Sequence, residues 1–414
     1  MAGPLLVNTP VLSQSMWIVE IYMDGTDYFL VTVDRFNIEA IMSDKNPPPE
    51  SASDKEALSQ LRDQIDGIDR RIGELISERA RCAQQVAEVK QSSNIGVGTF
   101  YRPEREAQVL RNIMEKNAGP LTDEEMARLF REIMSACLAL EKPIKVAYLG
   151  PEGTFTQQAC LKHFGQSAVT KAMAFIDEVF REVEAGSVNF GVVPVENSTE
   201  GVVNHTLDNF MFSNLKICGE VELRIHQNLM ISEVTNVGAI SRIYSHPQSL
   251  AQCRKWLDAN YPNAERVAVS SNAEAAKRVK GEWNSAAIAG ELAAQRYELQ
   301  ILAEKIEDRP DNSTRFLIIG TQEVPASGKD KTSIVVSMRN EPGALHNLLQ
   351  PFREHNVDLT RVETRPSQSG VWNYVFFIDM NGHQSDDTVA AAMEEVSSRA
   401  SEVKVLGSYP CAVL

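Results

Sequence analysis

Three short polar segments carry side chains that could bind a small, oxygen-rich molecule. The run 196–201 follows a buried strand pattern, 245–248 follows a second one, and 312–316 opens a third. In open α/β sheets, ligands bind where the carboxyl ends of the strands meet, so amide and hydroxyl groups gathered there could form one hydrogen-bonding site. Taken singly, each segment is also typical of an ordinary polar turn or strand cap.

A second candidate site is a set of four cations, Arg62, Arg79, Lys90 and Arg105, in a nearly charge-balanced region. Arg79 and Lys90 are eleven residues apart, which on one helix leaves them about 20° apart on the same face. Arg62 falls about 100° off that face, so it could reach the same pocket only from a partner chain lying antiparallel. The alternative is that these are solvated or i,i+4-paired surface cations.

Spacing disfavours metal and dinucleotide chemistry. The six cysteines and seven histidines form neither zinc-like pairs nor an HxxxH or HxH pattern, so we expect free thiols and no metal. The loop 150–155 follows a strand but lacks the GxGxxG spacing, and Pro151 blocks the close approach of a second glycine. We therefore reject NAD binding and expect no cofactor.

Charge and hydropathy predict the surroundings of the protein. The formal net charge is −15, and no long Lys/Arg run interrupts the acidic balance, so nucleic acid and anionic membranes are poor partners. No apolar stretch of about 18 residues and no basic leader are present, which predicts neither a membrane span nor a secretory signal. We expect a cytoplasmic protein that binds small metabolites.

Three kinds of domain must position these residues, as expected for a chain of 414 residues. Residues 55–142 are predicted to form an all-α domain, whose last helix begins with a capping box of Thr122 and Glu125. Residues 143–321 indicate an α/β domain, and residues 330–414 alternate as βαββαβ, which is typical of a ferredoxin-like α+β sandwich. The expected helices of the first domain are 55–91, 103–116 and 122–140, and the main expected strands of the second are 188–195, 220–231, 239–244, 266–270, 286–289 and 314–320.

The helix 55–91 would be roughly 55 Å long, which is more than a compact domain covers by itself. Its apolar residues recur every three or four positions, so it needs a partner helix. We expect that helix to come from another subunit, in a homodimer or a higher even-numbered oligomer. Residues 1–54 are predicted to be an extension and linker, with a hairpin from the runs 17–22 and 28–33. An equally open alternative is that Met42 is the natural start.

The run LRDQIDGIDRRIGELISERARCAQQVAEVK, followed by RPERE, resembles the all-helical chorismate mutase domain. The resemblance covers residues 55–142. It implies that Arg62 of one subunit joins Arg79, Lys90, Arg105 and Glu106 of the other around chorismate, and that the reaction needs no nucleophile. Two positions depart from the common pattern. Arg102 stands where many relatives have Asp, and Glu141 stands where many have a Gln that donates to the ether oxygen of chorismate.

The segments GPEGTF, VPVENS, SHPQ and TRF, present in that order, closely resemble prephenate dehydratase. The resemblance covers residues 144–320 and implies two α/β lobes, as in periplasmic binding proteins, with the substrate in the cleft between them. It makes Thr314 the catalytic residue, which gives a proton or hydrogen bond to the leaving hydroxyl. Arg315, Asn197, Ser198 and Gln252 would hold the carboxylates and keto group, and Phe155 and Phe316 would wall the cleft. The further expected substrate-binding residues are Thr154, Glu196, Ser245, His246 and Gln248.

The last unit resembles the phenylalanine-binding ACT domain through Gly343-Ala344-Leu345 and Glu363-Thr364-Arg365-Pro366. Thr364 replaces the usual Ser but keeps the hydroxyl. A purely structural domain is the alternative. The resemblance implies that phenylalanine binds the residues Asn340, Gly343, Ala344, Leu345, Glu363, Thr364 and Arg365.

These observations predict a bifunctional enzyme that converts chorismate to prephenate and prephenate to phenylpyruvate, and that phenylalanine inhibits. Two alternatives stay open. In the first, the helical domain serves only dimerisation, because Arg102 and Glu141 depart from the common pattern. In the second, the chain is a non-enzymatic phenylalanine sensor, which retention of the Glu-Asn-Ser and Thr-Arg-Phe segments argues against.

Overall fold

The computed structural model describes residues 16–23, 27–34, 52–92, 101–339, 341–366 and 374–413. By its internal contacts the chain divides into two compact units, residues 1–77 and residues 78–414. The boundary falls inside one long helix.

The first unit contains a strand pair and most of the long helix. β1 (Met16–Met23) and β2 (Asp27–Asp34) pair antiparallel, from Met16 opposite Asp34 to Met23 opposite Asp27, which confirms the predicted hairpin pairing. α2 (Ala52–Ser92) is a single helix of 41 residues, also as predicted. Its apolar stripe is exposed, with side chains 37% to 61% accessible: Leu58, Leu61, Ile65, Ile68, Ile72, Leu75 and Ile76.

The second unit begins with the end of α2 and two further helices, α3 (Pro103–Glu115) and α4 (Asp123–Glu141). Pro103 starts α3, where its missing N–H costs no hydrogen bond. Thr122 and Glu125 form the predicted capping box at the start of α4. The three predicted helices are therefore confirmed.

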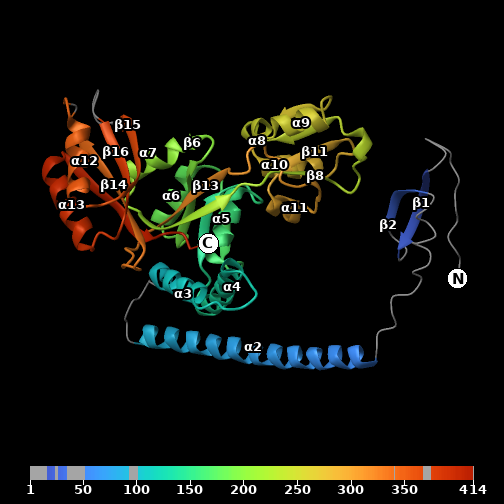
Figure 1. The fold of residues 1–414 in the computed structure, drawn as a ribbon. Coiled ribbons are helices and arrows are strands. Elements are labelled where there is room, and N and C mark those ends of the chain that lie inside the picture. The colour runs from blue at the N-terminus through green and yellow to red at the C-terminus, as the bar shows by residue number, and fades with distance from the viewer. Residues whose placement is uncertain are drawn as a thin grey trace. The chain divides into compact units, whose positions relative to one another are not determined.

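Two sheets of separate lobes follow (Figure 1). The first lobe has the strand order β4-β3-β5-β13-β7, with the short β6 paired to β5. Its elements are β3 (Lys145–Leu149), α5 (Phe155–Phe164), β4 (Val169–Met173), α6 (Ile176–Glu184), β5 (Phe190–Asn197), β6 (Gly201–Val202), α7 (Asn204–Phe212), β7 (Lys216–Arg224) and β13 (Ser313–Gly320).

The second lobe has the order β10-β9-β11-β8-β12. Its elements are β8 (Asn228–Ile231), the 3₁₀ turn η1 (Val237–Ala239), β9 (Arg242–Ser245), α8 (Pro247–Gln252), α9 (Arg254–Asn260), β10 (Glu265–Ala268), α10 (Asn272–Val279), β11 (Ser285–Ala289), α11 (Glu291–Tyr297) and β12 (Gln300–Ala303). The single strand expected over 220–231 is wrong. β7 and β8 belong to different sheets, and the chain passes between the lobes at 225–227 and again at 304–312.

The last domain is the expected βαββαβ unit, with the antiparallel order β15-β16-β14-β17. Its elements are β14 (Asp330–Met338), α12 (Ala344–Glu354), β15 (Leu359–Pro366), β16 (Tyr374–Asn381), α13 (Asp387–Arg399) and β17 (Glu402–Pro410). One face of its sheet carries its own core, which includes Ile334, Phe352 and Ile378.

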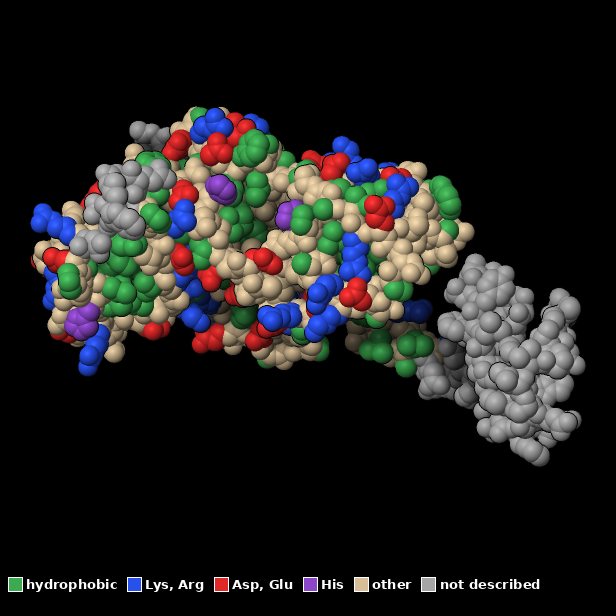
Figure 2. Space-filling model, turned by 90° about the horizontal axis from the view of Figure 1, so that it is seen from above, with side chains coloured by type: hydrophobic (Ala, Val, Ile, Leu, Met, Phe, Trp, Pro, Cys, Tyr) green, Lys and Arg blue, Asp and Glu red, His purple; other side chains and the backbone are tan. Residues whose placement is uncertain are grey.

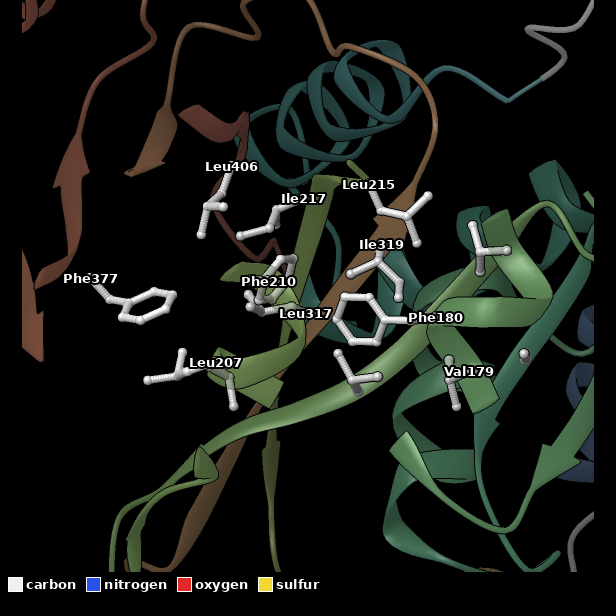
Figure 3. Packing of buried hydrophobic residues seen from close by; sticks show 14 of the residues in the cluster. Val179, Phe180, Leu207, Phe210, Leu215, Ile217, Leu317, Ile319, Phe377 and Leu406 are labelled. Carbon is white, nitrogen blue, oxygen red and sulfur yellow. The ribbon is translucent and has the colours of Figure 1, made fainter. Parts of the chain in front are cut away.

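The opposite face shares a core with the first lobe. Val335, Phe377 and Leu406 are buried in one cluster with first-lobe residues that include Leu207 and Phe210. Figure 3 shows Phe377 and Leu406 directed toward these residues and Ile217. β17 approaches β7 so closely that a Cβ on Gly407 would lie 2.4 Å from the carbonyl oxygen of Ile217. The last domain is therefore docked on the sheet that carries β5 and β13.

The surface carries both signs of charge. On the face seen in Figure 2, basic and acidic side chains are interspersed. Within the described ranges, no helix is long and apolar enough to cross a membrane.

Candidate active sites

Asn197 and Thr314 form the centre of the first candidate site. They are register partners on the antiparallel strands β5 and β13, and Nδ2 of Asn197 lies 2.8 Å from Oγ1 of Thr314. Oδ1 of Asn197 accepts the backbone N–H groups of Thr199 and Glu200, both at 3.0 Å. These two bonds orient the amide so that Asn197 donates and Thr314 accepts. The proton of the Thr314 hydroxyl meets no acceptor within the described ranges, so it is free to be donated.

A chain of side-chain amides links this pair to the second lobe. Nδ2 of Asn197 also lies 2.9 Å from Oδ1 of Asn312, Asn312 donates to Gln252 at 3.2 Å, and Gln227 donates to Gln252 at 3.3 Å. A cleft of about 440 Å³ opens beside Asn312 and Gln252. Its wall also holds two exposed cations, Lys255 and Arg309, together with the acidic residues Glu200, Glu307 and Asp308. Sequence reasoning did not assign Gln227, Lys255 or Arg309, because no motif surrounds them.

The hydroxyl of Ser198 holds the 197–201 loop in place. Its hydroxyl accepts the backbone N–H of Ser313 at 2.9 Å, which ties the 197–201 loop to the start of β13. His246 caps α8 and lies on the second lobe. Burial lowers the pKa of His246, whereas Glu200 of the first lobe opposes that shift. Glu200 of the first lobe and Gln252 of the second lobe line the same cleft.

Two residues that were expected to bind the substrate, Ser245 and Gln248, make hydrogen bonds within the second lobe. The Ser245 hydroxyl is buried and lies 2.8 Å from the carbonyl oxygen of Ile288 and 3.0 Å from Oδ1 of Asn272. The backbone N–H of Gln248 points at the His246 ring, 3.4 Å away. These contacts shape the start of α8, which carries Gln252.

The 150–155 loop joins the two lobes. Thr154 caps α5 and donates to the carbonyl of Leu149 at 3.2 Å. Phe155 packs so closely on the second lobe that a Cβ on Gly290 would lie 2.7 Å from its ring. Tyr297 donates to the carbonyl of Glu152 at 3.0 Å. The loop therefore sets the spacing of the lobes.

Three residues expected to touch the substrate lie elsewhere. Phe316 is only 2% exposed and belongs to the core of the first lobe, so it does not wall the cleft. Arg315 and Glu196 are register partners one position beyond the Asn197 and Thr314 pair. Because successive side chains of a strand point to opposite faces, both lie on the face toward the last domain, where Arg315 meets Asp379 at 2.6 Å.

The second candidate site is divided between the two units. Arg62 belongs to the first unit and Arg79 and Lys90 to the second, so the pocket that they would share stays a prediction. Arg105 is exposed on α3. Glu141 is half-buried at the end of α4, and within the described ranges its Oε1 is buried without a hydrogen-bond partner.

Glu106 lies at the contact between the helices and the first lobe. Its carboxylate pairs with Arg131 at 3.2 Å, and Arg131 donates to the carbonyl of Lys162 at 2.8 Å. Burial raises the pKa of Glu106, whereas Arg131 opposes that shift. Next to it, Tyr101 and His163 share a hydrogen bond of 3.0 Å. Burial, helped by Arg131, lowers the pKa of His163 to about 3. This arrangement ties Glu106 to the α/β domain in the single chain.

The expected effector residues stand on the last domain. Gly343 precedes α12 with φ of +85°, which favours glycine. Leu345 and Thr364 are exposed. Arg365 instead forms a bidentate ion pair with Asp208 of α7, at 2.7 and 2.8 Å. Asn340 lies outside the described residues.

No group of three or more His, Cys, Asp or Glu side chains suited to a metal occurs in the parts of the chain that the structure describes.

Comparison with known proteins identifies three regions. Residues 61–142 match the family of chorismate mutase type II, residues 146–324 match prephenate dehydratase, and residues 332–398 match the ACT domain. The chain is 68% identical over 364 residues to a bifunctional chorismate mutase/prephenate dehydratase of Stutzerimonas stutzeri, covering 87% of this chain and 100% of that protein. It is 67% identical over 365 residues to the protein of the same name from Pseudomonas aeruginosa, with the same coverage.

Among solved structures, prephenate dehydratase from Arthrobacter aurescens in complex with L-Phe superposes with a TM-score of 0.60 and 34% identity. The match covers 64% of this chain and 90% of that chain.

Proposed function

The chain belongs to the family of bifunctional chorismate mutase/prephenate dehydratases, and from this premise we propose which residues carry each reaction. The enzyme converts chorismate to prephenate and then prephenate to phenylpyruvate, in phenylalanine biosynthesis. We assign the first reaction to residues 55–142, the second to 143–321 and regulation to 330–414, with 1–54 as an extension and linker. The direction of the Asn197 to Thr314 hydrogen bond carries the assignment of the second reaction.

In the dehydratase reaction, Thr314 assists loss of the ring hydroxyl of prephenate. Because Oγ1 of Thr314 accepts from Asn197, its own proton can point at the leaving hydroxyl. The bond to the ring carboxylate breaks to release CO2, its electron pair moves into the ring, and the C–O bond breaks. With the proton received, the hydroxyl departs as water, and the Thr314 oxygen regains a proton from solvent before the next turnover. A threonine hydroxyl is a very weak acid, so aromatisation of the ring supplies most of the driving force.

The remaining cleft residues hold the substrate. Gln252 and Asn312 line the cleft and offer amide groups to the keto group. His246 begins α8, the helix of Gln252, and Ser198 precedes Thr199, which also lines the cleft. We assign Lys255 and Arg309 to the carboxylates in place of Arg315, since both cations line the cleft. Closure of the two lobes would exclude water from this site.

In the mutase reaction, Arg62 of one subunit and Arg79, Lys90 and Arg105 of its partner bind the dianion and stabilise the polarised transition state. No covalent step occurs, so catalysis consists of positioning and electrostatic stabilisation. The exposed apolar stripe of α2 supports assembly through this helix, because seven large apolar side chains on one face need a partner. An even-numbered homo-oligomer supplies it. Glu106 could join this site only in that assembly.

Phenylalanine is the proposed effector, bound at Gly343–Leu345 and Glu363–Arg365. The match to an L-Phe complex of a relative supports this assignment. The proposed compartment is the cytoplasm, where biosynthetic enzymes of the bacterial relatives find their substrates. Neither reaction needs a cofactor.

One experiment separates the alternatives. Purified protein is given chorismate, and prephenate and phenylpyruvate are measured with and without phenylalanine. Formation of both products, with less phenylpyruvate when phenylalanine is present, supports the full assignment. If added prephenate is dehydrated but chorismate is not consumed, the helical domain serves only dimerisation. Phenylalanine binding without turnover of either substrate would make the protein a sensor.

A further inference from the structure

Two consecutive pairs of register partners join β5 and β13, and their side chains lie on opposite faces of the sheet. Thr314 pairs with Asn197 in the dehydratase site, and the next pair, Arg315 with Glu196, lies on the face toward the last domain. Any shift of the second pair along or across the strands moves the first pair, because they are consecutive in both strands. The last domain contacts this second pair directly.

Arg315 is held by three partners. Its guanidinium donates to Asp379 at 2.6 Å, to Tyr409 at 3.0 Å and to Glu220 at 2.8 Å. Asp379 and Tyr409 belong to β16 and β17 of the last domain, and Glu220 belongs to β7. The Arg315 side chain is 16% exposed, so these bonds form in a water-poor interface where they are stronger than at the surface.

Arg361 of β15 joins the same group from the other side. Its Nη1 lies 4.0 Å from Asp379, and its Nε lies 3.6 Å from Glu196. Glu196, Arg361, Asp379 and Arg315 therefore form a chain of alternating charges. Its two ends, Glu196 and Arg315, are register partners on β5 and β13, so we call the group the coupling ring. Burial alone would raise the pKa of Asp379, but Arg315 and Arg361 hold it below its usual value. Asp379 thus stays ionised between the two arginines.

The two arginines of the coupling ring, Arg315 and Arg361, differ in their hydrogen bonding. The Arg315 half has short hydrogen bonds, whereas Nε and Nη2 of Arg361 are buried without a hydrogen-bond partner in the part of the chain that the structure describes. A buried guanidinium in this condition is costly. A small movement of β15 that brings Arg361 within hydrogen-bond distance of Glu196 would therefore be favourable and would pull on the strand that carries Asn197.

We propose that the coupling ring positions the catalytic pair of the dehydratase, and that phenylalanine inhibits by changing the hold of Arg361 on Glu196 and Asp379. Arg315 is then a positioning residue and not a substrate ligand. This proposal rests on the proposed phenylalanine effector function, since it describes how the effector reaches Thr314. A ligand shifts such an equilibrium only through different affinities for two states, which movement of β15 can provide because β15 carries Glu363–Arg365.

The test compares full-length Asp379→Asn and Arg361→Gln, alone and combined, with the original protein. Dehydratase rates are measured against prephenate and phenylalanine, and phenylalanine binding is measured by calorimetry. The readout is a ratio: the phenylalanine concentration that halves the dehydratase rate, divided by the Kd of phenylalanine. We expect this ratio to rise about tenfold in each single variant. The ratio in the double variant should be no higher than in the single variants, because both substitutions break the same ring. Arg361→Lys, which keeps the charge, should restore part of the coupling.

Lys216→Met is the matched control. Lys216 also joins the two domains, through the carbonyl of Val405 at 2.9 Å, but it lies beside Gly320 at the opposite end of β13 from Thr314. We expect this variant to keep the original ratio. An equal rise in Lys216→Met would mean that any loosening of the interface uncouples the domains, and would overturn the coupling ring.

The other outcomes are equally decisive. Variants that bind phenylalanine and show the original ratio, with only a lower Tm, would overturn the proposal, because the ring would then be structural. A raised KM for prephenate at an unchanged ratio would do the same. If the original protein binds no phenylalanine, the effector assignment itself fails, and that result is distinct from failure of the ring.

Discussion

The amide of Asn197 donates a hydrogen bond of 2.8 Å to the hydroxyl of Thr314, and not the reverse. The two backbone bonds to Oδ1 of Asn197 fix this direction. It leaves the threonine proton available, which is what a group that assists a departing hydroxyl requires.

Asn197→Asp tests this direction with almost no change of shape. The carboxylate would accept the Thr314 proton and could not donate, so we expect the dehydratase kcat to fall at least about 100-fold. The measurement is phenylpyruvate formation from prephenate. Thr199→Val, which removes a nearby hydroxyl but leaves the Asn197 and Thr314 pair intact, serves as the control. A kcat within a few fold of the original in Asn197→Asp would show that the orientation is irrelevant.

Ile72→Glu tests the role of α2. The change puts a charge in the middle of the apolar stripe, where side chains are exposed in the single chain, so we expect dissociation of the oligomer and loss of mutase activity. Dehydratase activity should persist. Light scattering gives the mass, and Asp69→Glu is a control on the same helix. An unchanged mass would place the subunit contact elsewhere.

Glu141→Gln tests how the mutase protonates or polarises the ether oxygen. Only a protonated carboxyl can donate a hydrogen bond, so we expect the mutase rate of the original protein to fall as pH rises. Glutamine donates at every pH, so the variant should show a flatter profile. The measurement is chorismate consumption across pH, and superimposable profiles of the two proteins would argue that Glu141 is not the donor.

Gly407→Ala tests the docking of the last domain. A Cβ there would lie 2.4 Å from a carbonyl oxygen of β7, so one strand must move, and we expect a loss of about 1–3 kcal/mol of stability. Gly281→Ala is the control, because its Cβ would meet nothing within 4 Å. Thermal unfolding compares the two, and equal Tm values would contradict the close packing of β17 on β7.

Sequence patterns predicted the elements whose signals are local. The capping box of Thr122 and Glu125 places the start of α4, and hydrophobic periodicity gives the whole of α2. The apolar run 220–231 led to the wrong prediction of a single strand, because composition cannot show that residues 225–227 pass from one sheet to another. The short strands β4, β6 and β12 were missed for want of any repeating pattern.

The candidate sites divide in the same way. Motifs pointed to Asn197 and Thr314, and these residues meet. The motif also drew in Arg315, Phe316 and Glu196, whose side chains lie in a core or on the opposite face, because a motif records neighbours in sequence and not the face of the strand. Lys255 and Arg309 come together only through the fold of the second lobe and the crossover at 304–312.

The central claim is that one chain performs two reactions in separate domains, with Thr314 essential for the second alone. The most direct test is Thr314→Ala in the full-length protein, with chorismate as substrate and both prephenate and phenylpyruvate measured. We predict that chorismate is consumed at the original rate while prephenate accumulates and phenylpyruvate is absent. Equal loss of chorismate consumption and phenylpyruvate formation in the folded variant, or phenylpyruvate formed at the original rate, would contradict the account.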